Sequence, residues 1–158
     1  MNADQLRDCA AALLAAHPLA GDDTEGLAGM LAACEQRALR PGALLCREGQ
    51  TGTELYFLLR GRVEVLKRDP EGFSRELSTV PAPALLGHMS LVDRSARSAT
   101  CRAVSDAVVA ALPYQQYLRL YTDPGAAGQS LRRLLIASMV DQLDRGNRTL
   151  ATLIAPAA

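Results

Sequence analysis

The chain has 158 residues, of which 49% are hydrophobic, enough for one domain with a full core but too few for two large domains. Its formal net charge at pH 7 is zero and it contains no basic block, which excludes a nucleic-acid reader that binds by electrostatic attraction. No apolar run approaches the ~20 residues that cross a bilayer, and the N-terminus lacks a signal-peptide pattern. We therefore expect a cytoplasmic protein without a membrane partner.

Two amphipathic helices are predicted at the start of the chain. Apolar residues recur at helical spacing over residues 3–17 and again over residues 24–35. Between them, Gly21-Asp22-Asp23-Thr24 supplies a turn and a helix N-cap. Residues 1–23 are assigned as an N-terminal helix and turn, which either docks a partner or covers one end of the core.

Short strands separated by turn residues dominate the middle of the chain. They are predicted at residues 55–59, 63–66, 76–80, 99–104 and 107–112. The fold class is therefore mainly β with flanking helices, and residues 24–122 form a β-roll or jelly roll. Such a roll places two sheets face to face and can hold a ligand between them.

A long C-terminal helix is predicted within residues 123–158, with Pro124 in its first turn. One helix face follows the alternating four-three spacing of a coiled-coil seam and carries a polar residue at one position. This stripe favours a parallel homodimer, and the alternative is that it packs within the subunit. Its residues are Ile136, Val140, Leu143, Asn147, Leu150 and Ile154.

A second face of the same helix is suited to packing on the roll. It carries Leu131, Leu134, Leu135 and Met139. On the exposed side, Asp141 is expected to pair with Arg145 one helical turn later.

Neither a metal site nor an active site is predicted. The four cysteines lie far apart among apolar residues and form no C-x-x-C motif, which favours buried reduced thiols. His17 and His88 are distant in sequence, without an evident nucleophile or carboxylate partner, and motifs of hydrolases, zinc proteases and Walker-type phosphate loops are missing. We expect no metal, no cofactor and no enzymatic activity. The cysteines are Cys9, Cys34, Cys46 and Cys101.

Residues 87–100 read Gly-His-Met-Ser-Leu-Val-Asp-Arg-Ser-Ala-Arg-Ser-Ala-Thr and combine a glycine turn, a short apolar helical turn and an arginine before a strand. The glycine lets the backbone approach an anion, and the helical turn offers unpaired N–H groups. An arginine fork can bind two phosphate oxygens at once. Arg97 is therefore the main candidate for recognising an anionic ligand.

This stretch resembles the phosphate-binding cassette of cyclic-nucleotide-binding domains. The family pattern is approximately Phe-Gly-Glu-Leu-Ala-Leu, a few variable residues, and Arg-(Ser/Thr/Ala)-Ala-Thr, which residues 86–91 and 97–100 match without a gap. The resemblance covers about residues 24–145. Over this range the chain is similar to the sensor domains of the catabolite activator protein and of kinase regulatory subunits. Upstream, the family frame is matched at Pro41-Gly42, residues 47–50, Gly52, residues 54–59 and residues 61–65.

The resemblance implies a regulatory sensor that binds cyclic AMP, cyclic GMP or a related small anion and signals through its C-terminal helix to an unidentified downstream protein. Arg97 and Ser98 would bind the phosphate, together with backbone N–H groups of residues 88–90. Where the family has a glutamate that accepts a hydrogen bond from the ribose, this chain has His88, whose neutral imidazole can also accept one. The implied ligand-binding residues are Leu86, Gly87, His88, Met89, Ser90, Arg97, Ser98 and Ala99.

Two other functions remain open at this point. A ligand-free scaffold would use the roll and the first helix only to hold a partner. A haem-based gas sensor is the second alternative, because relatives with a similar fold hold haem through a histidine near this region and imidazole is a good iron ligand.

Overall fold

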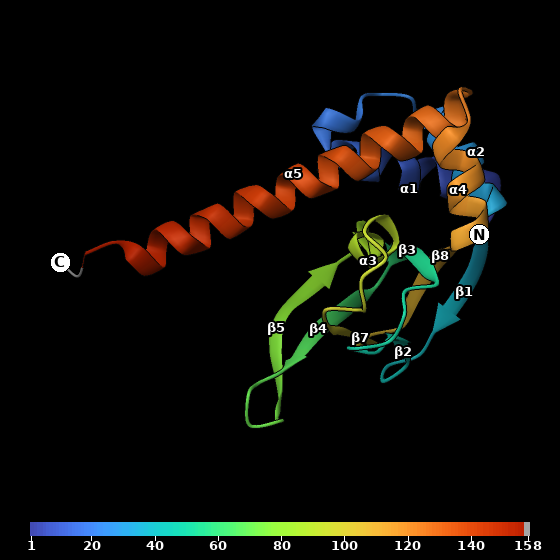
Figure 1. The fold of residues 1–158 in the computed structure, drawn as a ribbon. Helices are drawn as coiled ribbons and strands as arrows, with labels where there is room; N and C mark the ends of the chain where they lie inside the picture. The colour runs from blue at the N-terminus through green and yellow to red at the C-terminus, as the bar shows by residue number, and fades with distance from the viewer. Residues whose placement is uncertain (157–158) are drawn as a thin grey trace.

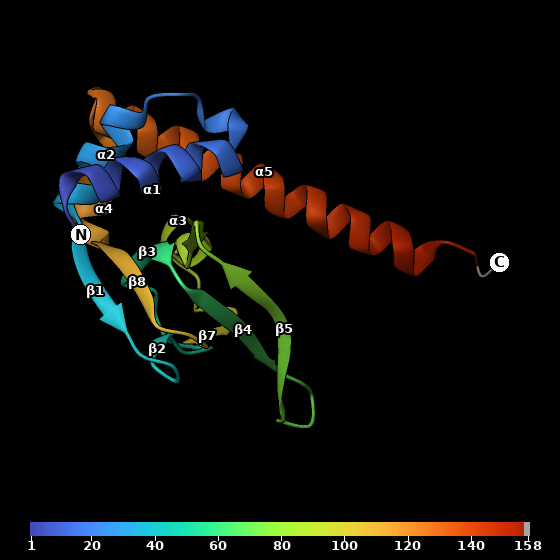
Figure 2. The ribbon, with the colours of Figure 1, turned by 180° about the vertical axis from the view of Figure 1, so that it is seen from behind.

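Two four-stranded antiparallel sheets face each other below a layer of helices, and the last helix extends well beyond the body (Figures 1 and 2). This computed structural model describes residues 1–156. The strand orders are β1-β8-β3-β6 and β2-β7-β4-β5, which confirms the predicted jelly roll. The strands are β1 (Glu35–Leu39), β2 (Leu44–Cys46), β3 (Glu54–Arg60), β4 (Arg62–Arg68), β5 (Ser74–Pro81), β6 (Ala84–Leu86), β7 (Thr100–Ala103) and β8 (Ala107–Pro113).

Strand β3 contributes side chains to two hydrophobic cores, one on each of its faces. Its residues 55–59 are all buried, although side chains of a strand alternate between its faces. Leu55 and Phe57 belong to the core beneath the helices, whereas Tyr56 and Leu58 belong to the core between the two sheets. The continuous apolar run therefore reflects a strand that is covered on both sides.

The helices form the cover over this strand. They are α1 (Ala3–Ala16), the short 3-10 helix η1 (Pro18–Ala20), α2 (Thr24–Ala33), α3 (His88–Val92), α4 (Tyr114–Thr122) and α5 (Ala126–Ile154). Asn2 and Asp23 are the N-caps of α1 and α2, each accepting a hydrogen bond from a backbone N–H of the first turn. None of the helices within residues 1–156 has the length and hydropathy of a membrane span.

Several boundaries differ from the sequence predictions. Helix α2 ends at Ala33, not at residue 35, because Glu35 already pairs with β8. Pro124 lies just before α5 instead of in its first turn, since Gly125 is the N-cap of that helix. Strands β1, β2 and β6 and helix α4 were not predicted, and the aromatic pair Tyr114 and Tyr117 stacks within α4.

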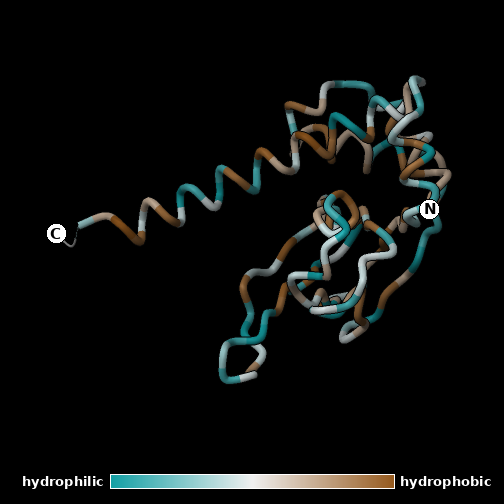
Figure 3. The backbone as a smooth tube through the Cα atoms, viewed as in Figure 1, coloured by the Kyte–Doolittle hydropathy of each residue, from teal (hydrophilic) through white to brown (hydrophobic). Residues whose placement is uncertain are grey.

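Helix α5 has a buried first half and an exposed second half. Leu131, Leu134 and Leu135 are buried in the core that includes Leu55 of β3, as predicted for the packing face. Near its start, α5 meets α4 so closely that a Cβ atom on Gly128 would lie 2.2 Å from the carbonyl oxygen of Asp123. Beyond the core the helix projects away from the body, and hydrophobic residues recur along the projecting part (Figure 3).

Candidate functional site: a pocket around a buried arginine

The predicted cassette forms one wall of a pocket of about 390 Å³. Strand β6 ends at Leu86, α3 follows directly after Gly87, and a loop carrying Arg97 leads into β7. All eight ligand-binding residues predicted from the sequence line this pocket. Sequence reasoning missed other lining residues, which include Cys46, Val65, Cys101 and Gln142.

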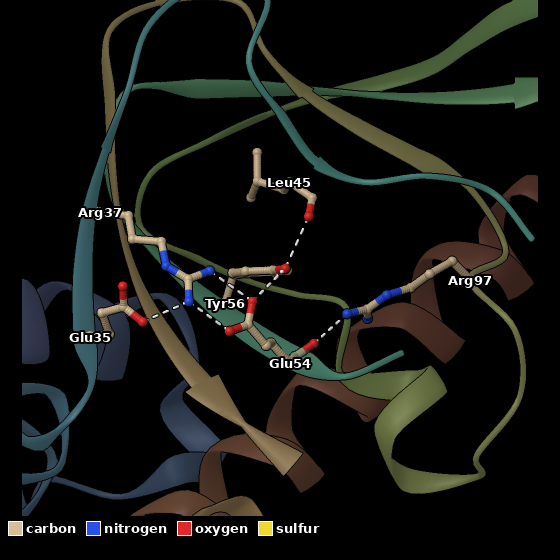
Figure 4. Close-up of polar contacts among 6 residues, drawn as sticks. All are labelled: Glu35, Arg37, Leu45, Glu54, Tyr56 and Arg97. Carbon is tan, nitrogen blue, oxygen red and sulfur yellow. Dashed lines mark hydrogen bonds and ion pairs between the residues drawn. The ribbon is translucent and has the colours of Figure 1, made fainter. Parts of the chain in front are cut away.

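The guanidinium group of Arg97 is held inside the protein, with only 5% of the residue exposed. Its Nη1 donates hydrogen bonds to the carbonyl oxygen of Gly87 at 2.6 Å and to Oγ of Ser90 at 2.8 Å. Its Nη2 donates to the backbone carbonyl oxygen of Glu54 (Figure 4). Three of the five guanidinium N–H groups are thus used among the described residues, which leaves Nε and one hydrogen of Nη2 for a ligand.

The carboxylate of Glu54 anchors the strand end that Arg97 contacts. Arg37 of β1 donates to both of its oxygens, at 2.8 and 2.7 Å, and this pairing lowers the pKa of Glu54. The hydroxyl of Tyr56 donates to the same carboxylate at 3.0 Å and lies 2.9 Å from the carbonyl oxygen of Leu45 (Figure 4). Bidentate pairs of this kind fix geometry as well as adding energy, so Arg97 is supported by an ordered network.

Two glycines make room for the guanidinium group. Gly87 has φ +75°, which favours glycine, and a Cβ atom there would lie 2.4 Å from Nη1 of Arg97. A Cβ atom on Gly52 would lie 2.4 Å from Oγ of Ser90 and 3.4 Å from Cζ of Arg97. Gly52 is therefore part of the packing around Arg97 and not only a corner of the roll.

His88 points toward helix α5. It is 1% exposed, its Nε2 lies 3.5 Å from Oγ of Ser138 on α5, and its Nδ1 has no hydrogen-bond partner within residues 1–156. Burial lowers the pKa of His88 to about 4, and the charge of nearby His17 contributes in the same direction. The imidazole is therefore neutral near pH 7 and connects the cassette to α5, while its contact with a ribose stays a prediction.

A second contact ties the N-terminal helices to α5. Nδ1 of His17, at the end of α1, lies 2.6 Å from Oδ2 of Asp141. The expected pair of Asp141 with Arg145 is wrong in detail, because the carboxylate faces His17 and Arg145 donates to the backbone carbonyl of Asp141. No sequence pattern could join His17 to Asp141, since they come from opposite ends of the chain.

A larger groove runs under α5 beside the pocket. Its volume is about 740 Å³, and it shares Val65, Leu85, Leu86 and Gln142 with the cassette pocket. Most of the rest of its lining comes from β5 and from polar residues of α5, such as Asp144 and Arg148, with Ala16 and His17 at the end of α1. The cassette pocket thus adjoins a groove that is lined by polar residues of the last helix.

The buried imidazole predicts a loss of stability in mild acid. Because the pKa of His88 is about 4 in the fold against 6.5 unfolded, the unfolded chain binds more protons between these values. The contribution of neutral His88 to the free energy of unfolding is therefore complete above pH 6.5 and decreases as pH falls toward 4. Urea unfolding should therefore show a loss of about 2 kcal/mol between pH 7 and pH 5 from this group. His88→Leu should remove that part of the slope, and equal slopes in both proteins would contradict the assignment.

The sequence is similar to a known protein family and to two characterised proteins. The family model described as cyclic nucleotide-binding domain matches residues 36–123, more than half of the chain. The cyclic AMP receptor protein of Thermus thermophilus is 34% identical over 101 residues, which are 63% of this chain and 47% of that protein. A cyclic nucleotide-gated potassium channel of Rhizobium etli is 30% identical over 102 residues, which are 61% of this chain and 27% of the channel.

The chain therefore spans about half the length, or less, of these curated relatives. A crystal structure of a cyclic nucleotide-binding domain from Methylobacillus flagellatus shares the fold with a TM-score of 0.83. It is 22% identical, and the match covers 98% of this chain and 88% of that one. Within residues 1–156, no group of three or more His, Cys, Asp or Glu residues is arranged to hold a metal ion.

Proposed function

Because the chain belongs to the cyclic nucleotide-binding domain family, we propose that it is a regulatory sensor domain whose cassette pocket binds cyclic AMP or cyclic GMP. The observation that carries this proposal is the buried guanidinium group of Arg97 in the cassette pocket. A buried guanidinium group with two N–H groups left over, in a pocket of about 390 Å³, supplies the charge and the fork geometry that a phosphate requires. Ser98 and the backbone at residues 88–90 line the same pocket and complete the proposed cradle.

Helix α5 is the proposed output of the sensor. Gln142 of α5 lines the cassette pocket, and Ser138 lies against His88 of the cassette. A ligand that touches Gln142 or displaces His88 would alter the contacts that seat α5. Such differential contacts are what a ligand needs in order to shift a conformational equilibrium.

The exposed stripe of α5 supports the proposal of a parallel homodimer. Ile136 and Leu143 are 61% and 67% exposed, and Leu150 and Ile154 are exposed as well. These side chains recur with the spacing of a coiled-coil seam, and Asn147 occupies a position at which an asparagine can fix register. A second copy of α5 would cover this apolar stripe.

Calorimetric titration of cyclic AMP and cyclic GMP into the purified protein tests the proposed ligand. The protein is first unfolded, stripped of carried-over ligand and refolded. We expect saturable 1:1 binding of at least one cyclic nucleotide, and much weaker binding of adenosine or guanosine because they lack the phosphate that Arg97 would contact. Failure of both nucleotides to bind a folded protein would overturn the proposal and favour a ligand-free scaffold. A haem absorption band in the purified protein would favour the gas sensor.

A further inference from the structure

Two cysteines that are far apart in the sequence lie opposite each other in the pocket wall. Cys46 of β2 and Cys101 of β7 are register partners in an antiparallel pair of strands, next to an irregularity at Leu45. Directly opposed residues in such pairs have Cα atoms about 4.5–5.5 Å apart, within the roughly 4.4–6.8 Å that a disulfide spans. Both cysteines also line the cassette pocket, so their side chains share one face of the sheet.

The two thiols differ in acidity because they interact with each other. The hydrogen bond with the Cys101 thiol lowers the pKa of Cys46, and the positive charge of Arg97 lowers it further. The same interaction and burial raise the pKa of Cys101. Cys46 is therefore the more acidic of the two thiols, and it lies beside a second thiol that can resolve an oxidised form.

The other two cysteines lack these features and serve as internal controls. Sγ of Cys9 donates to the carbonyl oxygen of Leu59 at 3.7 Å, and Sγ of Cys34 donates to that of Met30 at 3.3 Å. Sγ of Cys46 makes the same kind of contact with the carbonyl oxygen of Ala99 at 3.8 Å, but Cys46 also has Cys101 opposite it in the sheet. Burial raises the pKa of Cys34 to about 12 and also raises the pKa of Cys9. Neither lines the cassette pocket.

We propose that Cys46 and Cys101 are a modification site at which hydrogen peroxide oxidises the pair to an intramolecular disulfide. The Cys46 thiolate attacks one peroxide oxygen, an S–O bond forms, the O–O bond breaks, and the leaving hydroxide takes up a proton to become water. The Cys101 sulfur then attacks the sulfenic acid, an S–S bond forms, the S–O bond breaks, and a second water leaves with the proton of Cys101. Two thiols are oxidised, and one peroxide is reduced to two waters.

The position of Cys46 allows the small backbone movement that formation of a disulfide with Cys101 requires. The strand order places β2 at the edge of its sheet, and β2 is only three residues long. Its register is already irregular between Leu44 and Cys46. An edge strand with few neighbours can move toward β7 until the sulfurs reach the about 2.0 Å of a disulfide bond without displacing the core strands.

Hydrogen peroxide applied to the reduced protein tests the proposal without any substitution. Trypsin should then release residues 38–47 and 98–102 as one reducible, linked peptide, because the Arg40–Pro41 bond resists cleavage. The intact chain should lose two titratable thiols and the mass of two hydrogen atoms. A protein that keeps all four thiols, or becomes overoxidised at Cys46 without a link to Cys101, would overturn the proposal.

Substitutions sharpen the result. The Cys9→Ser/Cys34→Ser double variant should still form the linked peptide at the wild-type rate. Cys101→Ser should stop at a sulfenic acid on Cys46 that dimedone can trap, and Cys46→Ser should leave Cys101 largely unreacted. Disulfide formation through Cys9 or Cys34 in the wild-type protein would also contradict the assignment.

The claim that this pair lies in a nucleotide pocket rests on the proposed function. A protection experiment tests the oxidation of the pair and the binding of a nucleotide separately. At a nucleotide concentration about ten times Kd, only about one chain in ten is unoccupied, so disulfide formation should slow about tenfold. Cys9 should react with iodoacetamide at an unchanged rate. A disulfide in a protein that binds no nucleotide would contradict the proposed function but retain the thiol pair. Nucleotide binding without protection would show that the pair lies outside the binding site.

Discussion

Replacing Arg97 with alanine should weaken cyclic-nucleotide binding roughly 10- to 150-fold, which corresponds to about 1.5–3 kcal/mol for the loss of a charged hydrogen-bonding partner. The guanidinium group is buried in the cassette pocket, where its attraction to a phosphate is screened less than at the surface. Titration calorimetry at matched ionic strength measures the change. Arg97→Lys should recover part of the affinity, because it retains the charge but loses the fork.

The same substitution also removes internal hydrogen bonds, so stability must be measured beside affinity. Arg97 holds the carbonyl oxygens of Gly87 and Glu54, and both would lose a partner. Arg119→Ala is the matched control, because this arginine of α4 is exposed and does not line the pocket. Unchanged affinity in a folded Arg97→Ala protein would refute the assigned phosphate contact.

Leu143→Lys should convert the proposed dimer into a monomer. Leu143 is 67% exposed in the single chain and lies in the middle of the α5 stripe, so a lysine there would place two like charges at the centre of the seam. Because the side chain packs on nothing else in the subunit core, the free energy of unfolding of the monomer itself should hardly change. Sedimentation equilibrium of both proteins across a range of concentrations measures the shift in association.

Thr149→Lys provides the control for that experiment. Thr149 is exposed on the same helix but lies off the stripe, so a lysine at this position adds the same charge without entering the seam. It should leave the association constant close to that of the wild-type protein. A wild-type chain that stays monomeric at its highest soluble concentration would disprove the dimer, as would equal weakening by both lysines.

The cassette could be predicted from sequence because its geometry is local. Gly87, His88 and Arg97 lie within eleven consecutive positions, and a glycine turn, one helical turn and a loop bring them together. The apolar run of β3 and the packing face of α5 were also readable, since burial on both sides and helical spacing leave direct patterns.

What the sequence could not show depends on contacts between distant segments. The pairing of Cys46 with Cys101 follows from the register of β2 on β7, and a three-residue strand leaves no periodic pattern to set that register. The contact of His17 with Asp141 depends on where α5 crosses the end of α1. The inward direction of His88 could not be derived either, because the family position it occupies suggested a ligand contact instead.

The close crossing at Gly128 limits how a signal can leave this domain. With no space for even a methyl group between the start of α5 and the carbonyl groups of Leu120 and Asp123, α4 and α5 cannot slide or rotate past each other independently. We therefore expect the two helices to move as one rigid elbow. Since α4 follows β8 without an intervening loop, we expect this elbow to bend at the junction of Pro113 and Tyr114. A hinge located there would transmit ligand-dependent strain from the roll itself to the far tip of α5.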